Sequence, residues 1–289
     1  MNLDDTFHSN TTLITTEYDG TISQGSGFFY QVLGEQDEKN SKWTSIKEVW
    51  LVTNRHVLLP KNEGKEVIPN KITFNLRRVV NDKVSWIPIE LTQNEFVKRA
   101  KFHENPNIDV GIISILDLFT DLIKNEPKNE ENSRTSIMNI FAVSSEKLPG
   151  KNKLHVQVTD DIITIGYPRG FYDSKNIFPI IKGGIIASRW GMNFDGEPCF
   201  LIDTKLFPGS SGSLVLTKPN DVVVEDGKIF CSKEKQFAFL GIYSGEPIIN
   251  RQPIETDDMI IQIKEGFNVG KVWYGFLVDD IIKDGKSIK

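Results

Sequence analysis

The sequence predicts an all-β protein with two groups of strands, and three observations carry this prediction. The apolar segments are short, four to nine residues each, and are rich in Val, Ile, Phe, Tyr or Thr. Most of them are bounded by Gly, Pro, Asn or Asp, a pattern typical of β-sandwiches and β-barrels. The apolar spacing of a long helix is scarce along the chain.

The predicted elements fall into two groups along the chain. The strands of the first group are Ser26–Leu33, Val49–Thr53, Ile72–Val80, Val84–Leu91 and Val110–Leu116. The strands of the second group are Ile162–Tyr167, Gly184–Trp190, Phe200–Asp203, Ser213–Thr217, Phe237–Tyr243 and Val272–Val278. Helical spacing is confined to Leu116–Ile123 and Val278–Asp284, so we expect a short helix near the C-terminus.

A polar zone separates the two groups of strands and contains the longest polar run of the chain, KNEPKNEENSRTS at 124–136. We therefore expect an N-terminal barrel over 1–123, a linker or insertion over 124–153, and a C-terminal barrel over 154–289. An alternative stays open, in which the zone is only an elaborated surface loop.

Composition excludes two classes of protein. The net charge of −5 comes from 34 basic and 39 acidic side chains, and no basic block occurs. A nucleic-acid-binding protein normally carries such a block, so we expect no nucleic-acid partner. No run of about 18 apolar residues occurs, so we expect no membrane span.

The N-terminus and the cysteines indicate a cytoplasmic protein. The segment MNLDDTFHSN has no positive flank and no apolar run, so it does not predict an export signal. The two cysteines, Cys199 and Cys231, are then expected to be reduced, because disulfides persist mainly in oxidising compartments.

The segment FPGSSGSLV at 207–215 indicates a nucleophile. Ser211 stands in a glycine-rich turn that leads directly into an apolar strand, which exposes its hydroxyl. Gly212 lets a substrate approach closely, and Gly209 can adopt backbone angles closed to other residues. The N–H groups of Gly209 and Ser211 are then expected to form an oxyanion hole. The alternative for this segment alone is a plain turn.

A histidine follows an apolar strand in the segment WLVTNRHVLL at 50–59. A neutral imidazole is well suited to take a proton from a serine near pH 7. Only His56 comes directly off a buried strand, in contrast to the other three histidines, His8, His103 and His155. The alternative for His56 alone is a structural histidine.

An aspartate begins an apolar strand in NIDVGIISI at 107–115. Burying a carboxylate is costly unless it is paired or hydrogen-bonded, and an imidazole N–H is one such partner. Asp109 would hold His56 in one tautomer and stabilise its protonated form. The alternative for Asp109 alone is a turn residue at the edge of a strand.

The three candidates occur in the order His56, Asp109, Ser211, with the first two in one strand group and the serine in the other. This order predicts a site in a cleft between the two groups. Eight segments, in sequence order, resemble the trypsin/chymotrypsin-like superfamily and within it the HtrA/Deg-type branch. They are QGSGFF at 24–29, VTNRHV at 52–57, IDVGI at 108–112, IGYP at 165–168, GIIAS at 184–188, DTKLFPGSSG at 203–212, LGIYS at 240–244 and YGFLV at 274–278.

The resemblance implies a chymotrypsin-like double β-barrel with a short C-terminal helix, and peptide-bond hydrolysis as the activity. It gives His56, Asp109 and Ser211 the roles of the catalytic triad, and Gly209 with Ser211 the role of the oxyanion hole. Ser244 matches a family position that hydrogen-bonds near the aspartate or the substrate backbone. No metal and no other cofactor is implied.

The resemblance also suggests a substrate-binding set of Lys205, Ser244 and Glu246. Lys205 begins the segment that matches the pocket wall, and Glu246 lies just beyond Ser244. A carboxylate at this place predicts a preference for a basic residue before the scissile bond, with a solvated loop charge as the alternative.

Two departures from the family pattern affect what is expected. Ser213 replaces a second glycine of the serine motif. Ser210 stands where digestive enzymes have an aspartate, and a neutral hydroxyl cannot form an ion pair with a new N-terminus. Activation by N-terminal trimming is therefore not expected, and neither is an appended PDZ-type peptide-binding domain.

The sequence thus predicts a serine endopeptidase, an intracellular bacterial trypsin-like protease that acts on a protein or peptide substrate. A free protease endangers its host, so we expect narrow specificity or gating by a protein partner at the insertions 34–47 and 117–153. The alternatives are a catalytically silent double-barrel binding module and an esterase or acyl transferase with the same triad.

Overall fold

The computed structural model describes residues 3–36, 44–80, 83–125, 142–151, 154–168, 171–225, 227–250, 254–256, 259–261, 264–266 and 268–288. Most of the regular structure in these residues is β-strand, which confirms the predicted fold class. The two predicted insertions lie partly outside the described residues, at 37–43, 126–141 and 152–153. No described helix is long and apolar enough to cross a membrane.

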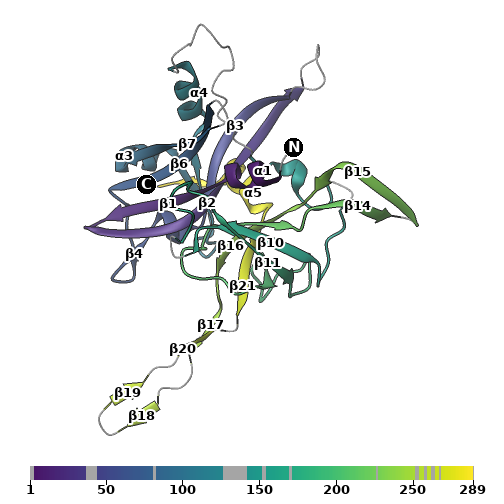
Figure 1. Ribbon diagram of the computed structural model, residues 1–289. Coiled ribbons are helices and arrows are strands. Elements are labelled where there is room, and N and C mark those ends of the chain that lie inside the picture. The colour runs from purple at the N-terminus through teal and green to yellow at the C-terminus, as the bar shows by residue number, and fades with distance from the viewer. Residues whose placement is uncertain are drawn as a thin grey trace.

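The first half of the chain forms an eight-stranded sheet, here called the N-terminal sheet, with the order β22-β8-β9-β3-β2-β1-β6-β7 (Figure 1). Its strands are β1 (Thr11–Tyr18), β2 (Thr21–Gln36), β3 (Thr44–Thr53), β6 (Lys71–Val80), β7 (Lys83–Thr92), β8 (Ala100–Phe102), β9 (Gly111–Ser114) and β22 (Lys286–Ser287). The helices of this half are α1 (Leu3–Asn10), α2 (Arg55–Leu58), α3 (Gln93–Arg99) and α4 (Leu116–Lys124).

The second half forms a closed six-stranded barrel, here called the C-terminal barrel, with the order β10-β11-β12-β21-β16-β13. Its strands are β10 (Asp161–Gly166), β11 (Ile180–Ile186), β12 (Cys199–Asp203), β13 (Leu214–Thr217), β16 (Phe239–Gly245) and β21 (Val269–Tyr274). The short helix α5 (Leu277–Asp284) follows β21, as the sequence predicts, and β22 then returns to the N-terminal sheet, where it pairs with β8.

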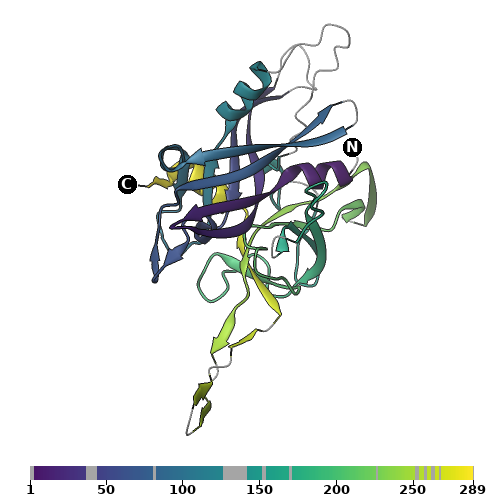
Figure 2. The same cartoon turned by 60° about the vertical axis from the view of Figure 1, so that its left-hand side comes forward.

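Four two-stranded hairpins and one 3₁₀ turn complete the described structure. They are β4 (Lys61–Asn62) with β5 (Lys65–Glu66), β14 (Asn220–Glu225) with β15 (Lys228–Gln236), β17 (Ile248–Asn250) with β20 (Lys264–Gly266), β18 (Ile254–Thr256) with β19 (Met259–Ile261), and η1 (Ser145–Lys147). The hairpins between β17 and β20 extend away from the barrel in both views (Figures 1 and 2).

The N-terminal sheet encloses its own apolar core. Ile72, Phe74 and Leu76 are fully buried and alternate along β6 with partly exposed residues, as expected when one face of a strand is covered. Helix α3 lies against β6, β7 and β22 and adds the fully buried Phe96 to this core. The helix begins with a capping box between Thr92 and Glu95, which satisfies its first backbone N–H groups.

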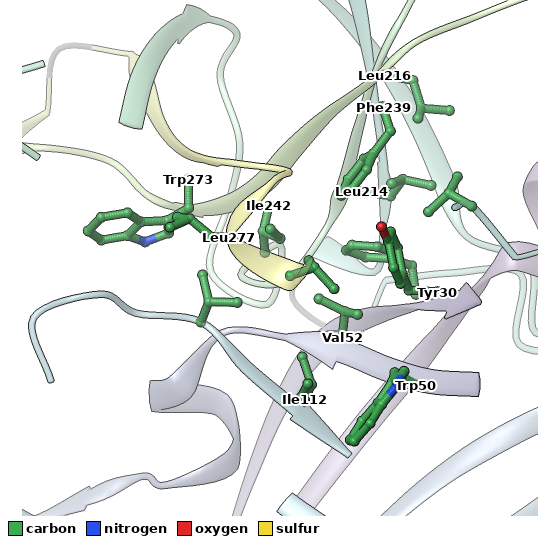
Figure 3. Packing of buried hydrophobic residues seen from close by; sticks show 14 of the residues in the cluster. Tyr30, Trp50, Val52, Ile112, Leu214, Leu216, Phe239, Ile242, Trp273 and Leu277 are labelled. Carbon is green, nitrogen blue, oxygen red and sulfur yellow. The ribbon is translucent and has the colours of Figure 1, made fainter. Parts of the chain in front are cut away.

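A second core joins the two halves. Val52 and Ile112 from the N-terminal sheet face Leu214, Phe239 and Ile242 from the C-terminal barrel (Figure 3). All five are fully buried. Apolar area removed from water stabilises such a contact by roughly 25 cal/mol per Å². The halves therefore form one packed unit, and residues at their junction hold fixed positions.

Helix α5 belongs to this junction too. Leu277, Val278 and Ile281 are buried in the core between the halves. The Tyr30 hydroxyl of β2 donates to the Asp279 carboxylate at 2.6 Å, which ties the start of the helix to the N-terminal sheet.

The structure differs from the sequence expectations at several places, and three of them show what the sequence pattern lacks. Strand β11 spans Ile180–Ile186, not Gly184–Trp190. Its apolar pairs at 180–181 and 185–186 are separated by Lys182, Gly183 and Gly184, and its residues are mostly exposed or half-buried. Strand β1 lies outside the predicted strands, although threonine favours strands, because its apolar residues are only Leu13, Ile14 and Tyr18. The buried Thr16 hydroxyl donates to the Val57 carbonyl at 2.9 Å. The β14–β15 hairpin is polar and largely exposed, and it therefore lacks the apolar pattern on which strand prediction depends.

Candidate active site

His56 and Asp109 lie together because the strands that precede and follow them are neighbours. His56 lies in α2, just after β3, and Asp109 lies just before β9. Thr53 of β3 is the register partner of Gly111 of β9, so both candidates are at the same end of this strand pair. The junction core places that end beside the C-terminal barrel.

The Asp109 carboxylate holds His56 at two atoms. Its Oδ2 is 2.7 Å from the His56 Nδ1, and its Oδ1 accepts the His56 backbone N–H at 2.9 Å. An Nδ1–H that faces a carboxylate leaves Nε2 of the neutral ring as a proton acceptor. The arrangement therefore fixes both the orientation and the tautomer that a general base requires.

Two further residues hold Asp109. The Ser244 hydroxyl donates to Oδ2 at 2.7 Å, so this oxygen contacts both His56 and Ser244. The Asn54 side chain donates to the Asp109 backbone carbonyl at 2.7 Å and is fully buried. Ser244 was singled out from the sequence, whereas Asn54 was not, although it lies inside the quoted segment VTNRHV.

Ser211 lies in a turn between β12 and β13. The Ser210 N–H donates to the Phe207 carbonyl at 3.0 Å, which closes a four-residue turn with Gly209 at its third position. Gly209 has a φ of 90°, as the third position of a type II turn requires, and Gly212 has a φ of 85°. Both glycines therefore adopt backbone angles that other residues rarely adopt.

The Ser211 hydroxyl is brought to the same cluster through Ser244. It donates to the Ser244 backbone carbonyl at 3.0 Å, while the Ser244 hydroxyl contacts Asp109. The structure thus gathers His56, Asp109, Ser211 and Ser244 from four separate segments of the chain.

The two N–H groups expected to form an oxyanion hole have no protein acceptor in the part of the chain that the structure describes. They belong to Gly209 and Ser211. The Gly209 carbonyl, in contrast, accepts from the Ser26 hydroxyl at 2.9 Å. Two unpaired N–H groups beside a serine hydroxyl are what an oxyanion hole needs.

The three predicted substrate-binding residues are not all in one place. Ser244 and Glu246 line a cavity of about 340 Å³ together with Asp195, Glu197 and Lys271. Lys205 does not line this cavity; its ammonium lies 6.0 Å from the centre of the Phe207 ring.

The charges of the cavity are unevenly paired. The Glu246 carboxylate accepts the Asn268 backbone N–H at 2.5 Å, and Lys271 forms an ion pair with Glu197. Three carboxylates face one ammonium, so the cavity beside Ser244 has a net negative lining.

The described residues contain no group of three or more His, Cys, Asp or Glu side chains that could hold a metal ion. Both cysteines are free; Cys199 is buried and Cys231 is exposed. Burial raises the pKa of the Cys199 thiol, which opposes a thiolate at this position.

Residues 25–224 match the trypsin-like peptidase domain. The matched range is more than two thirds of the chain and includes His56, Asp109 and Ser211. The chain belongs to this family. The matched range includes most strands of the N-terminal sheet and strands β10 to β13 of the C-terminal barrel, while β16, β21 and α5 lie beyond it. No curated protein sequence matches the chain.

Several solved structures are similar to this trypsin-like peptidase domain. The Rv3671c protease of M. tuberculosis has a TM-score of 0.42 at 13% identity, over 99% of this chain and 87% of that one. The protease Anisep of Arthrobacter nicotinovorans has a TM-score of 0.46 at 12% identity, over 96% and 94%. A scabies mite inactivated protease paralogue has a TM-score of 0.45 at 13% identity, over 97% and 98%.

Proposed function

We propose that the protein is a serine endopeptidase with His56, Asp109 and Ser211 as its catalytic triad. The observation that carries this proposal is the hydrogen-bonded chain from the His56 ring through the Asp109 carboxylate and Ser244 to the Ser211 hydroxyl. A base held by a carboxylate, and a serine in a glycine turn linked to that carboxylate through Ser244, fit acyl transfer. In the described residues the N–H groups of Gly209 and Ser211 donate to no protein acceptor.

Catalysis would begin when the Ser211 hydroxyl leaves the Ser244 carbonyl and donates to Nε2 of His56. Ser211 Oγ attacks the scissile carbonyl carbon, and the proton passes to His56. The negative charge that develops on the carbonyl oxygen is stabilised by the N–H groups of Gly209 and Ser211. The Asp109 carboxylate stabilises the imidazolium without taking its proton.

The second half of the reaction uses the same groups. His56 gives its proton to the leaving amine, and the amine departs from the acyl-enzyme. A water molecule then gives a proton to His56 and attacks the ester carbonyl, and Ser211 regains its proton as the product acid leaves. No step requires a metal or an organic cofactor.

The acidic cavity beside Ser244 supports a basic side chain on the N-terminal side of the scissile bond. A substrate strand that runs along residues 244–246 would place a side chain over this cavity, where three carboxylates outnumber one ammonium. Opposite charges on the substrate and on the cavity lining mainly determine specificity. Lys205 lies elsewhere and is assigned no part in this preference.

Three finer assignments rest on the same proposal. The ordered motifs favour the HtrA/Deg-type branch, and the two free thiols are compatible with a reducing compartment such as the bacterial cytoplasm. Activity against other host proteins would be limited by narrow specificity or by a regulatory partner. The rival functions are a silent binding module and an esterase or acyl transferase.

A fluorophosphonate probe tests the proposal. Purified wild type, Ser211→Ala and the control Ser232→Ala, an exposed serine of β15, are labelled and mapped by mass spectrometry, and each is given a peptide library. We expect label at Ser211 in wild type and the control, none in Ser211→Ala, and a loss of roughly 10⁶ in kcat for that variant.

The rivals give different results in the same experiment. Turnover of activated esters without cleavage of any peptide would favour the esterase. Absence of label and cleavage, with and without added cell extract, would favour the silent module. Cleavage after small or aliphatic residues alone would remove the preference for a basic side chain.

A further inference from the structure

Ser26 of β2 makes two hydrogen bonds to the segment that carries the nucleophile. Its hydroxyl donates to the Gly209 carbonyl at 2.9 Å, and its backbone N–H donates to the Ser211 carbonyl at 2.8 Å. Ser26 belongs to the N-terminal sheet and lies 183 residues from Gly209 in the sequence. One residue of the first half therefore clamps a turn of the second half.

The clamp brackets the peptide group that supplies an oxyanion donor. The two bonds fix the peptide groups between 209 and 210 and between 211 and 212. The peptide group between them carries the Ser211 N–H. With both neighbours fixed, this N–H has little freedom to rotate away from the developing oxyanion.

The direction of the Ser26 hydroxyl is itself fixed. The Tyr167 backbone N–H, just after β10, donates to the Ser26 oxygen at 2.8 Å. Ser26 and Tyr167 are both fully buried, so this oxygen has no competing contact with solvent. The remaining O–H therefore points at the Gly209 carbonyl.

The space around Ser26 leaves no room for additional side-chain atoms on the neighbouring glycines. A Cβ on Gly212 would lie 2.0 Å from the Ser26 carbonyl and 2.2 Å from the Thr53 hydroxyl oxygen. A Cβ on Gly166 would lie 2.6 Å from the Ser26 hydroxyl oxygen. The turn and β2 are thus in direct contact, with no side chain between them.

The side chain of Ser210, the residue before Ser211, does not hold the nucleophile turn. Ser210 is 1% exposed, and in the described part of the chain its hydroxyl has no hydrogen-bond partner. The position where an aspartate would form an ion pair therefore contributes no hydrogen bond from its side chain. The turn is held instead by Ser26 of the other half, together with backbone hydrogen bonds within its own barrel, where the Ser210 carbonyl accepts the Ser213 N–H at 2.9 Å.

We propose that Ser26 is a positioning residue that sets the nucleophile turn, so that the oxyanion hole forms when the two halves pack together and needs no proteolytic activation. This inference rests on the proposed function. Because the clamp acts on the Ser211 N–H and not on the cavity beside Ser244, it affects the chemical step more than substrate binding.

The test compares Ser26→Ala with a matched control, Thr217→Val. Thr217 is a buried residue of the C-terminal barrel, and its hydroxyl oxygen accepts the Ala238 backbone N–H at 2.8 Å, away from the nucleophile turn. Loss of an oxyanion donor typically costs about 10²–10³ in rate, so loss of a group that positions one is expected to lower kcat about 10- to 100-fold. We expect KM to change less than about 2-fold, because the lost contact acts on the transition state and not on substrate binding.

A second readout separates positioning from general loosening. Affinity for a peptide boronate, which forms a tetrahedral adduct with serine, should fall in Ser26→Ala in parallel with kcat, whereas affinity for a product peptide should not. Ser26→Cys keeps a weak donor, so its kcat and its boronate affinity are expected to lie between those of wild type and Ser26→Ala. If Ser26→Ala does not fold, Ser26→Cys tests the same prediction.

The outcomes are distinct. A folded Ser26→Ala with wild-type kcat, or an equal loss of kcat in Thr217→Val, overturns the positioning role while the protease remains. Activity of wild type only after proteolytic trimming overturns it as well. A wild type that neither labels with fluorophosphonate nor cleaves peptides overturns the proposed function and this inference with it.

Discussion

The His56–Asp109 pair and the nucleophile turn are built in opposite ways. The pair is held mainly by side-chain contacts at the neighbouring ends of β3 and β9, with one further contact from the Ser244 hydroxyl of β16. The turn is held by its backbone, through Ser26 of the other half and through Tyr243, whose carbonyl accepts the Gly212 N–H at 2.8 Å. The geometry of the His56–Asp109 pair depends mainly on the chemistry of its side chains. The geometry of the nucleophile turn depends mainly on backbone contacts with β2 and β16.

This contrast predicts different responses to substitution. A change in the pair alters proton transfer and leaves the fold intact, because the groups involved are partly exposed; the side chains of His56 and Asp109 are 43% and 23% exposed. A change in the turn alters chemistry and stability together, because the same contacts join the two halves.

The largest effect is expected from Asp109→Asn, which tests the pair. An amide in place of the carboxylate no longer requires an Nδ1–H on His56 and no longer stabilises the imidazolium, so kcat should fall about 10⁴-fold with an unchanged melting temperature. Peptide hydrolysis and thermal unfolding measure the two quantities. A loss of rate below about 10-fold would remove Asp109 from the triad.

A smaller loss of rate, joined to a loss of stability, is expected from Gly212→Ala, which tests the turn. Its φ of 85° disfavours alanine, and the new Cβ would lie 2.0 Å from the Ser26 carbonyl. We expect the free energy of unfolding to fall by about 2–4 kcal/mol, from backbone strain and overpacking together.

The matched control for this change is Gly64→Ala. Gly64 has a φ of 80°, and a Cβ there would meet nothing within 4 Å, so only the strain of about 1 kcal/mol remains. Urea unfolding of both variants isolates the cost of the clash. Equal losses in the two variants would show that the contact between Ser26 and the turn is loose.

The smallest effect on stability is expected at Arg55, which precedes His56 and forms an ion pair with Glu66 through two hydrogen bonds of 2.7 Å. Hydrogen bonding to Arg55 lowers the pKa of Glu66 below its ordinary value of 4.5. A lowered carboxyl pKa stabilises the fold above pH 4.5, and this contribution is lost as the pH falls through the folded-state pKa.

Glu66→Gln should therefore lower stability at pH 7 and have a smaller effect at pH 3, because the contribution is lost as the pH falls through the lowered pKa. Solvent screening limits the difference to about 0.5–1 kcal/mol. Urea unfolding at the two pH values measures it, with Glu146→Gln, at the exposed residue of η1, as the control. An equal effect at both pH values would show that the ion pair does not contribute.

The sequence was sufficient for the fold class and for selecting three candidate residues that the structure then places near one another. Strands such as β3 and β13 carry apolar runs that any core requires, and His56, Asp109 and Ser211 stand in motifs whose chemistry can be read locally. The structure brings these three residues into one cluster through Ser244.

What the sequence could not supply depends on long-range contacts. Threonines become core residues in β1 only because carbonyls elsewhere accept their hydroxyls. The role of Ser26 requires knowing that β2 meets the nucleophile turn, and the separation of Lys205 from Glu246 follows from how β12 and β16 place their ends. The helix α3 could have been found, since Thr92 and Glu95 form a recognisable capping box.

The pairing of β22 with β8 has a consequence for how the chain matures on the ribosome. Until residues 286–287 have been synthesised, β8 is an unpaired edge, and until α5 has emerged the junction core lacks Leu277, Val278 and Ile281. Contacts of such large sequence separation form late in folding. A nascent chain would thus carry His56, Asp109 and Ser211 before it has the packing that holds them together, so the candidate site cannot assemble fully until residues 277–287 have emerged.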